Sequence, residues 1–173
     1  MTNYMIATIL SLISACFTFA SSWTKDPDCT YWYQVGQCLV YAAASYFFGV
    51  YPSIIMMLIN AFRNVLVATG KYKPAFCFLF SVLALVFGLM TNTSGFVGYL
   101  SILATVQYSI CSYYMRGEIP VKINNFINLA IWLSYDILIL DVFTGITDVI
   151  SIVLTTLTVK RIYTSRQRFT NRS

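Results

Sequence analysis

The chain of 173 residues has no histidine and very few charged residues. Charged side chains make up 10% of the sequence, whereas soluble domains average about 25%. Hydrophobic residues make up 58%, and the mean hydropathy is +0.72. A chain with so little polar surface is not expected to fold as a soluble domain. We predict an all-α integral membrane protein, with nearly all of its length used by spans of about 20 residues each.

The sequence also lacks the motifs that carry catalysis or metal binding. Its five cysteines are scattered and form no Cys-x-x-Cys pair, so neither a disulfide framework nor a conventional metal site is expected. A cysteine nucleophile would lack a histidine base, and no Gly-x-Ser-x-Gly or phosphate-binding loop is present. The sequence therefore predicts a protein that is not an enzyme and uses no cofactor and no metal.

Breaks in the apolar runs predict seven membrane-spanning helices. The apolar runs 33–69 and 123–159 would each measure roughly 55 Å as one helix, but the hydrocarbon core is only about 30 Å thick. Each run must therefore cross twice, and Gly49-Val-Tyr-Pro52 marks the first break. The predicted helices cover residues 4–21, 33–49, 52–69, 74–91, 96–114, 123–139 and 143–160.

The basic residues predict the orientation of these spans. Every Lys and Arg except Arg63 lies in one of three predicted loops or in the tail from Lys160. These are the first, the third and the fifth loop, and Lys122 stands at the end of the fifth. The positive-inside rule then predicts a topology with the N-terminus outside and the C-terminus inside. Anchoring against anionic lipid explains the basic tail, so the lipid bilayer is the expected partner and nucleic acid is not.

The helix spacing predicts an internal repeat. A shift of about 92 residues moves the predicted helices 4–21, 33–49 and 52–69 onto 96–113, 125–141 and 144–161. This spacing predicts a parallel 3+1+3 repeat with its axis along the membrane normal. The predicted units are a three-helix bundle at 1–70, a linker helix at 71–94, a second bundle at 95–161 and a basic cytoplasmic tail at 162–173.

Three polar residues share one face of the third predicted helix. Asn60, Arg63 and Asn64 are spaced i, i+3 and i+4. An arginine at this depth costs at least about 2.5 kcal/mol, so that face needs protein or water against it. Two interpretations stand. In the first, Arg63 has a structural role, in which it bonds a neighbouring helix or extends to the headgroups. In the second, it is part of a polar site inside the bundle.

Other polar residues extend this candidate path. Asp148 is the one acid well inside a predicted span, and it either pairs with Arg63, shares a water-filled cavity with it, or is solvated at the outer interface. Asn128 and Trp132 are spaced i, i+4 and could face a solute or pack between helices, as could Gln107. Asn124 and Asn125 are interpreted as caps of the helix start, with exposure to a solute as the alternative.

The segments Tyr51-Pro-Ser and Leu58-Ile-Asn-Ala-Phe-Arg63 resemble the YgjV family of bacterial inner membrane proteins. A Gly145 and Asp148 pair in the last span and the basic C-terminus extend the likeness. The resemblance implies a multi-pass protein of the bacterial inner membrane. The 3+1+3 pattern is also similar to that of the SWEET and PnuC transporters, in which the solute sits between two three-helix bundles. Unlike SWEETs, this chain has no proline inside a predicted helix and no Pro-Gln motif.

Two functions fit this sequence. The first is a carrier or facilitator of a small polar solute that is sugar-like, vitamin-like or anionic. Its predicted path is lined by Asn60, Arg63, Asn64, Gln107, Asn128, Trp132 and Asp148. The second is a non-transporting membrane scaffold or partner subunit, in which Arg63 and the Asn residues clamp helices together. The near absence of polar residues from the helix 74–91 favours the carrier. A homo-oligomer remains open on either interpretation.

Overall fold

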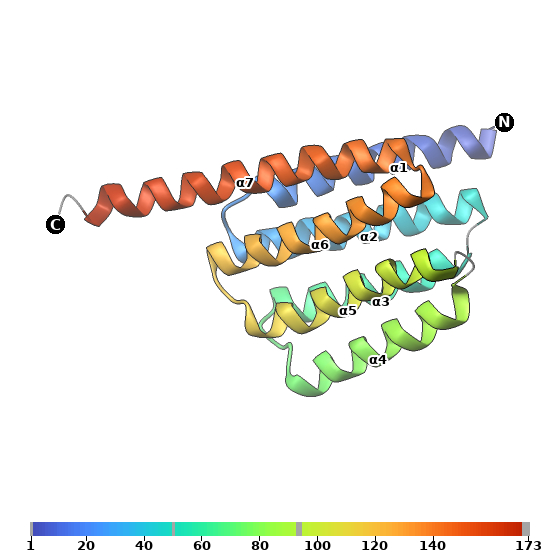
Figure 1. The fold of residues 1–173 in the computed structure, drawn as a ribbon, viewed down its shortest axis with the longest axis horizontal. Coiled ribbons are helices and arrows are strands. Elements are labelled where there is room, and N and C mark those ends of the chain that lie inside the picture. The colour runs from blue at the N-terminus through green and yellow to red at the C-terminus, as the bar shows by residue number, and fades with distance from the viewer. Residues whose placement is uncertain (1, 50, 93–94, 171–173) are drawn as a thin grey trace.

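The computed structural model describes residues 2–49, 51–92 and 95–170, and this part of the chain is helical throughout (Figure 1). It contains seven α-helices and one short 3-10 helix, η1, and no strand, so the all-α prediction is confirmed. In order, the helices are α1 Thr2–Trp23, α2 Pro27–Phe48, α3 Tyr51–Ala68, α4 Pro74–Thr91, η1 Gly95–Val97, α5 Gly98–Tyr114, α6 Glu118–Ile139 and α7 Val142–Thr170.

Capping residues set several of these boundaries. The Asp26 carboxylate accepts hydrogen bonds from the backbone N–H groups of Asp28 and Cys29, and Pro27 occupies the first turn, so α2 begins six residues before the predicted start. At its other end Gly49 closes α2 in the left-handed conformation, with φ 75°. The predicted break at 49–52 includes Val50, which lies outside the described residues.

The second half departs further from the predicted boundaries. Because α6 begins at Glu118, Lys122 lies inside a helix, and its side chain is fully buried. The sequence had predicted a position for Lys122 beside the cytoplasmic loop. Asn124 and Asn125 are likewise inside α6, so the interpretation that they cap its start is wrong. The last helix continues through the predicted tail to Thr170, whereas Arg172 lies outside the described residues.

The helices pack as two rows of three with α4 beside them. Helix α2 packs along both α1 and α3 in one row, and α6 packs along both α5 and α7 in the other. Figure 1 shows the second row lying over the first, with α4 at the lower edge against α5. Contacts between α1 and α7 close one side of this arrangement, and contacts between α3 and α5 close the other.

Glycines allow close approach at two of the helix contacts. A Cβ added to Gly88 on α4 would lie 2.5 Å from Cγ1 of Ile102 on α5, and one added to Gly36 on α2 would lie 2.8 Å from the Phe17 ring on α1. The backbones of these helices therefore come closer than any side chain would permit. These glycines serve close packing of the helices.

The distribution of polarity suits a lipid environment. Large apolar side chains such as Phe78, Leu89 and Phe96 are exposed on the outside, while many Ser, Thr and Asn side chains are buried between the helices. Four helical segments are long and apolar enough to cross a membrane: Thr2–Trp23, Pro74–Thr91, Gly95–Tyr114 and Val142–Gln167. A shorter apolar helix covers Ser53–Ala68. The other three of the seven predicted spans, including the one that this shorter helix covers, stay predictions.

Candidate functional site

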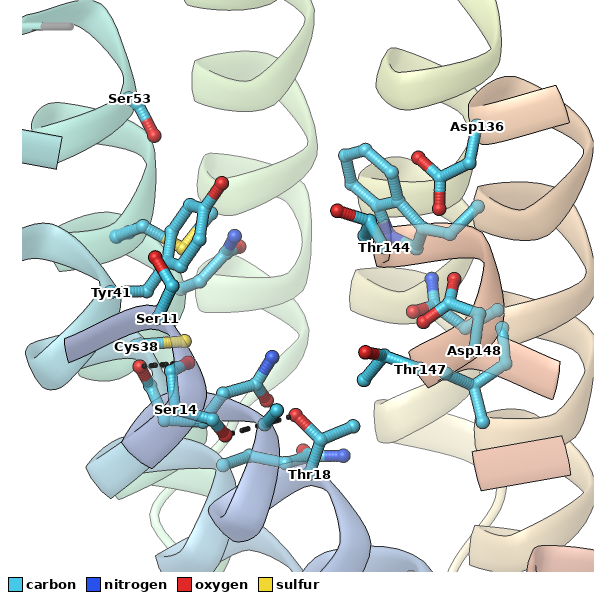
Figure 2. A pocket seen from close by; sticks show the side chains of 18 of the residues that line it. Ser11, Ser14, Thr18, Cys38, Tyr41, Ser53, Asp136, Thr144, Thr147 and Asp148 are labelled. Atoms are coloured by element: carbon cyan, nitrogen blue, oxygen red, sulfur yellow. Dashed lines mark hydrogen bonds between the residues drawn. The ribbon is translucent and has the colours of Figure 1, made fainter. Parts of the chain in front are cut away.

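A cavity of about 860 Å³ lies between the two rows of helices. Its lining comes from α1, α2, α3, α5, α6, α7 and the turn at Asp141, and no described residue of α4 takes part. Hydroxyl groups of α1 form one wall, and Figure 2 shows Ser11, Ser14 and Thr18 facing Asp136, Thr147 and Asp148 across the space. The interior of the bundle is therefore a polar chamber inside an apolar shell.

Most of the predicted path residues meet in this cavity. Six of the seven contribute to its lining, namely Asn60, Arg63, Asn64, Asn128, Trp132 and Asp148. Gln107 lies outside the lining, between α5 and α6, where its amide donates to Asn124 Oδ1 at 2.8 Å. Asn128 Nδ2 donates to the carbonyl oxygen of Ala104 at 2.7 Å, and this hydrogen bond links α6 to α5.

Arg63 is held by several neutral partners. Its Nη1 donates to Ser109 Oγ at 3.0 Å, and its Nε and Nη2 both donate to Asn64 Oδ1, at 3.3 and 3.2 Å. Its guanidinium carbon lies 4.8 Å from the centre of the Tyr108 ring. The ring face and the three hydrogen bonds replace part of the hydration that this cation loses on burial. Arg63 therefore links α3 to α5.

From the Tyr108 ring under this arginine, a series of hydrogen bonds runs through α2 and α6 to α7. The Tyr108 hydroxyl donates to Gln34 Oε1 at 2.7 Å, Gln34 Nε2 donates to Asn125 Oδ1 at 3.2 Å, and Asn125 Nδ2 donates to Thr155 Oγ1 at 3.3 Å. We call Arg63, Tyr108, Gln34, Asn125 and Thr155 the polar layer. It joins α3, α5, α2, α6 and α7 at one depth, about two helical turns from the loops at 24–26 and 115–117.

Beyond the polar layer the bundle is tightly closed. We call this side the basic end, because Lys25 there bonds Ser165, and Arg166 pairs with Glu118 at 3.2 Å. Lys122 is fully buried between the layer and this end, where its ammonium donates to the Ser21 carbonyl and to Thr30 Oγ1. It thus holds the last turn of α1, whose carbonyls favour a cation.

The cavity extends from the polar layer toward the opposite end. Its lining there includes Phe48 at the end of α2 and Asp141 at the turn between α6 and α7. On the other side the lining includes Gln34 and Asn125 of the polar layer and reaches Ser21 in the last turn of α1. The chamber is one-sided, because it ends against the fully buried Ser22, Thr30 and Lys122 at the basic end and continues toward the end where α2 stops at Gly49 and α6 turns into α7.

Two buried carboxylates line this chamber without a partner. Asp136 is 3% exposed and Asp148 is 7% exposed, and Oδ2 of each has no hydrogen-bond partner within the described residues. Arg63 and Asp148 share the cavity but form no ion pair, so direct pairing is not observed. A solvated position for Asp148 at the outer interface is also wrong, because the side chain is buried. Asp141 differs, since it caps α7 by accepting from Thr144 N and Oγ1.

Lining residues recur at a fixed separation. Gln34 and Asn125 bond each other and lie 91 residues apart. The same separation relates further lining residues of similar chemistry, namely Ser14 and Thr105, Gln37 and Asn128, Tyr41 and Trp132, and Ser53 and Thr144. The two rows therefore present matching side chains to one chamber.

Sequence reasoning missed several members of this site. Tyr108, Gln34 and the α1 hydroxyls were not selected, because a tyrosine or serine in a span is common and carries little signal by itself. Asp136 was not selected either, and its burial depends on α7 packing against it beside Gly145. The spacing of 91 residues between polar positions was the signal that could have identified Gln34 and Gln37.

Comparison with known proteins identifies a family for this chain. The model of a family described as bacterial inner membrane protein matches residues 5–166, which is nearly the whole chain. No curated protein and no solved structure matches the chain.

Proposed function

The chain belongs to the Imp-YgjV family of bacterial inner membrane proteins, and on this premise we propose that it is a carrier or facilitator of a small polar solute. It is a multi-pass protein of the bacterial inner membrane. The observation that carries the proposal is the one-sided polar cavity between the two rows of helices. A chamber of about 860 Å³ is large enough for a sugar-sized or vitamin-sized molecule.

The arrangement of the helices supports this proposal. A carrier needs two units that can move against each other around a solute site, and the position of the cavity between two rows of helices is compatible with this need. Contacts between the rows include those of α1 with α7 and of α3 with α5, the polar layer, and the bonds of Lys122 to Ser21 and Thr30. The polar layer would then be the inner gate, and the present structure the state that is closed toward the basic end.

The repeat fits the same mechanism. In a parallel 3+1+3 repeat, α1, α2 and α3 correspond to α5, α6 and α7, so the α1–α7 contact corresponds to the α5–α3 contact. The lining residues separated by 91 residues support this correspondence, one residue from the shift of about 92 expected from span lengths. Helix α4 then serves as the linker, and its absence from the cavity lining agrees with that role.

The charge distribution supports an orientation for this carrier. Lys25, Arg116, Arg161 and Arg166 gather at the basic end, and the positive-inside rule assigns that end to the cytoplasm. The N-terminus and the chamber would then face the outer side of the membrane. In this orientation the solute enters from the outer side of the membrane and moves through the chamber to the polar layer.

A second function has one observation in its favour. Arg63 bonds Asn64 and Ser109 and lies over Tyr108, as expected of a structural clamp. If the clamp is its whole role, the protein is a non-transporting scaffold or partner subunit of another membrane complex.

The two functions are separated by ligand-induced thermal stabilisation of the purified protein. The panel contains sugars, nucleosides, vitamins, organic anions and organic amines, since a ligand that binds the folded state raises the melting temperature by mass action. The carrier function predicts a ligand that raises the melting temperature of Gln107→Ala but not that of Trp132→Ala, because Trp132 lines the cavity and Gln107 does not. No stabilisation by any compound, together with failure of Arg63→Ala to fold, would favour the scaffold.

A further inference from the structure

The matching of the two rows does not extend to the buried acids Asp136 and Asp148. Counting 91 residues back from Asp148 gives Met57, which also lines the cavity, and counting back from Asp136 gives Ser45. Ser45 donates to Ser53 Oγ at 3.0 Å, whereas Asp136 Oδ2 has no partner. A neutral residue therefore satisfies the packing at both positions in the first row. The fold does not require a carboxylate at either place.

No cation within the described residues compensates these two acids. The one ion pair there is Arg166 with Glu118, at the basic end. Lys122 bonds uncharged oxygens, and Arg63 bonds an amide and a hydroxyl. An isolated buried carboxylate is costly, and α6 ends three residues after Asp136, which adds the negative end of its dipole. This wall of the chamber therefore favours a positive charge.

The surroundings of the acids indicate what carries that charge. Trp132 and Tyr135 line the same chamber with their rings in edge-to-face contact at 5.7 Å, and Tyr41 lines the facing side. Aromatic rings attract an organic ammonium group over their faces, whereas they supply no ligand to a small metal ion. Within the described chain, no group of three or more His, Cys, Asp or Glu is placed to hold a metal ion.

We propose that Asp136 and Asp148 form a binding site for a protonated amine, and that the solute of the cavity carries this group. The inference rests on the proposed carrier function and narrows it to amine-bearing solutes. The ammonium hydrogens would bond the two free Oδ2 atoms, one from α6 and one from α7. The remainder of the solute would extend toward the polar layer, where Asn60 Oδ1 is a further buried acceptor without a partner in the described residues.

The test compares amines with alcohols of the same shape on the unaltered, purified protein. Ethanolamine is paired with ethylene glycol, putrescine with butanediol, and phenethylamine with phenylethanol. We expect the melting temperature to rise with at least one amine and to stay unchanged with its alcohol. Asp136→Asn and Asp148→Asn should each lower the binding affinity for that amine by about tenfold or more. Glu118→Gln, a matched change at the exposed basic end, should leave its binding unchanged.

Other outcomes overturn the inference in distinguishable ways. Stabilisation by a sugar or organic anion, lost in Trp132→Ala while every amine is inactive, would contradict the amine site and leave the carrier function standing. Equal stabilisation by sodium or potassium chloride would assign the acids to an inorganic cation. Binding of neither amines nor any other compound class would contradict both proposals. Because the amine and alcohol pairs use the unaltered chain, the comparison does not depend on whether a variant folds.

Discussion

At the scale of single residues, Arg63 shows how the bundle holds a charge without an acid. Its planar guanidinium reaches Asn64 and Ser109 in different directions while its face lies over Tyr108. A lysine ammonium is a compact charge and cannot make all of these contacts at once. The guanidinium shape, rather than the charge alone, is what this position uses.

We therefore expect Arg63→Lys to destabilise the protein by roughly 1–3 kcal/mol, because at least one buried acceptor loses its donor. Thermal or denaturant unfolding of the purified protein in detergent measures the change. Arg161→Lys is the matched control, since Arg161 is exposed and its guanidinium lies over the Trp23 ring with no buried acceptor to satisfy, so a change within about 0.5 kcal/mol is expected there. Equal stability of Arg63→Lys and the unaltered protein would refute the shape argument.

Local spacing predicted some of the site residues and could not predict others. Asn60, Arg63 and Asn64 followed from helical periodicity, and all three line the cavity. Lys122 was assigned to the cytoplasmic loop side because basic residues beside a loop are usually solvated. Its burial depends on the last turn of α1 and on Thr30, which are distant in the sequence. Contacts of this kind are not encoded in the residues next to the lysine.

At the scale of helices, prolines and glycines predicted boundaries better than hydropathy did. Helix α4 runs over 74–91 as predicted, with Pro74 in its first turn. Helices α2 and α6 begin earlier than their apolar runs, after Asp26 and Gly117. Their first turns are polar, so a method based on apolar length places them in loops. The number of helices was correct because each chain break carries its own local signal.

The contact between α4 and α5 depends on a glycine. A methyl group at Gly88 would meet Ile102 at 2.5 Å, so Gly88→Ala should force the two helices apart and cost roughly 1–3 kcal/mol of unfolding free energy. Ile102→Ala should recover part of that loss in the double variant. In contrast, Gly145→Ala on α7 would place its methyl no closer than 3.8 Å to a neighbour and should be tolerated. Unfolding curves of the four variants test this, and a neutral Gly88→Ala would disprove the close contact.

At the scale of the whole molecule, polarity is arranged around a central chamber and an apolar outside. Composition predicted the membrane location, which the family match confirms. The order in which helices neighbour one another was beyond the sequence, because span lengths fit many packings. The chamber arises only when the side chains of six helices converge. Its use as a solute path therefore requires a direct measurement of water access.

Cys38 provides that measurement, because it lines the cavity from α2. The test uses a variant that retains only this cysteine, in membrane vesicles of defined sidedness, with a cationic methanethiosulfonate reagent that does not cross membranes. A variant that retains only Cys77, which lies between α4 and α5 near the Ser109 carbonyl, is the control. The account predicts that Cys38 reacts when the reagent is added from the outer side and reacts slowly from the cytoplasmic side, while Cys77 stays unmodified. An unreactive Cys38, or faster reaction from the cytoplasmic side, would contradict the account.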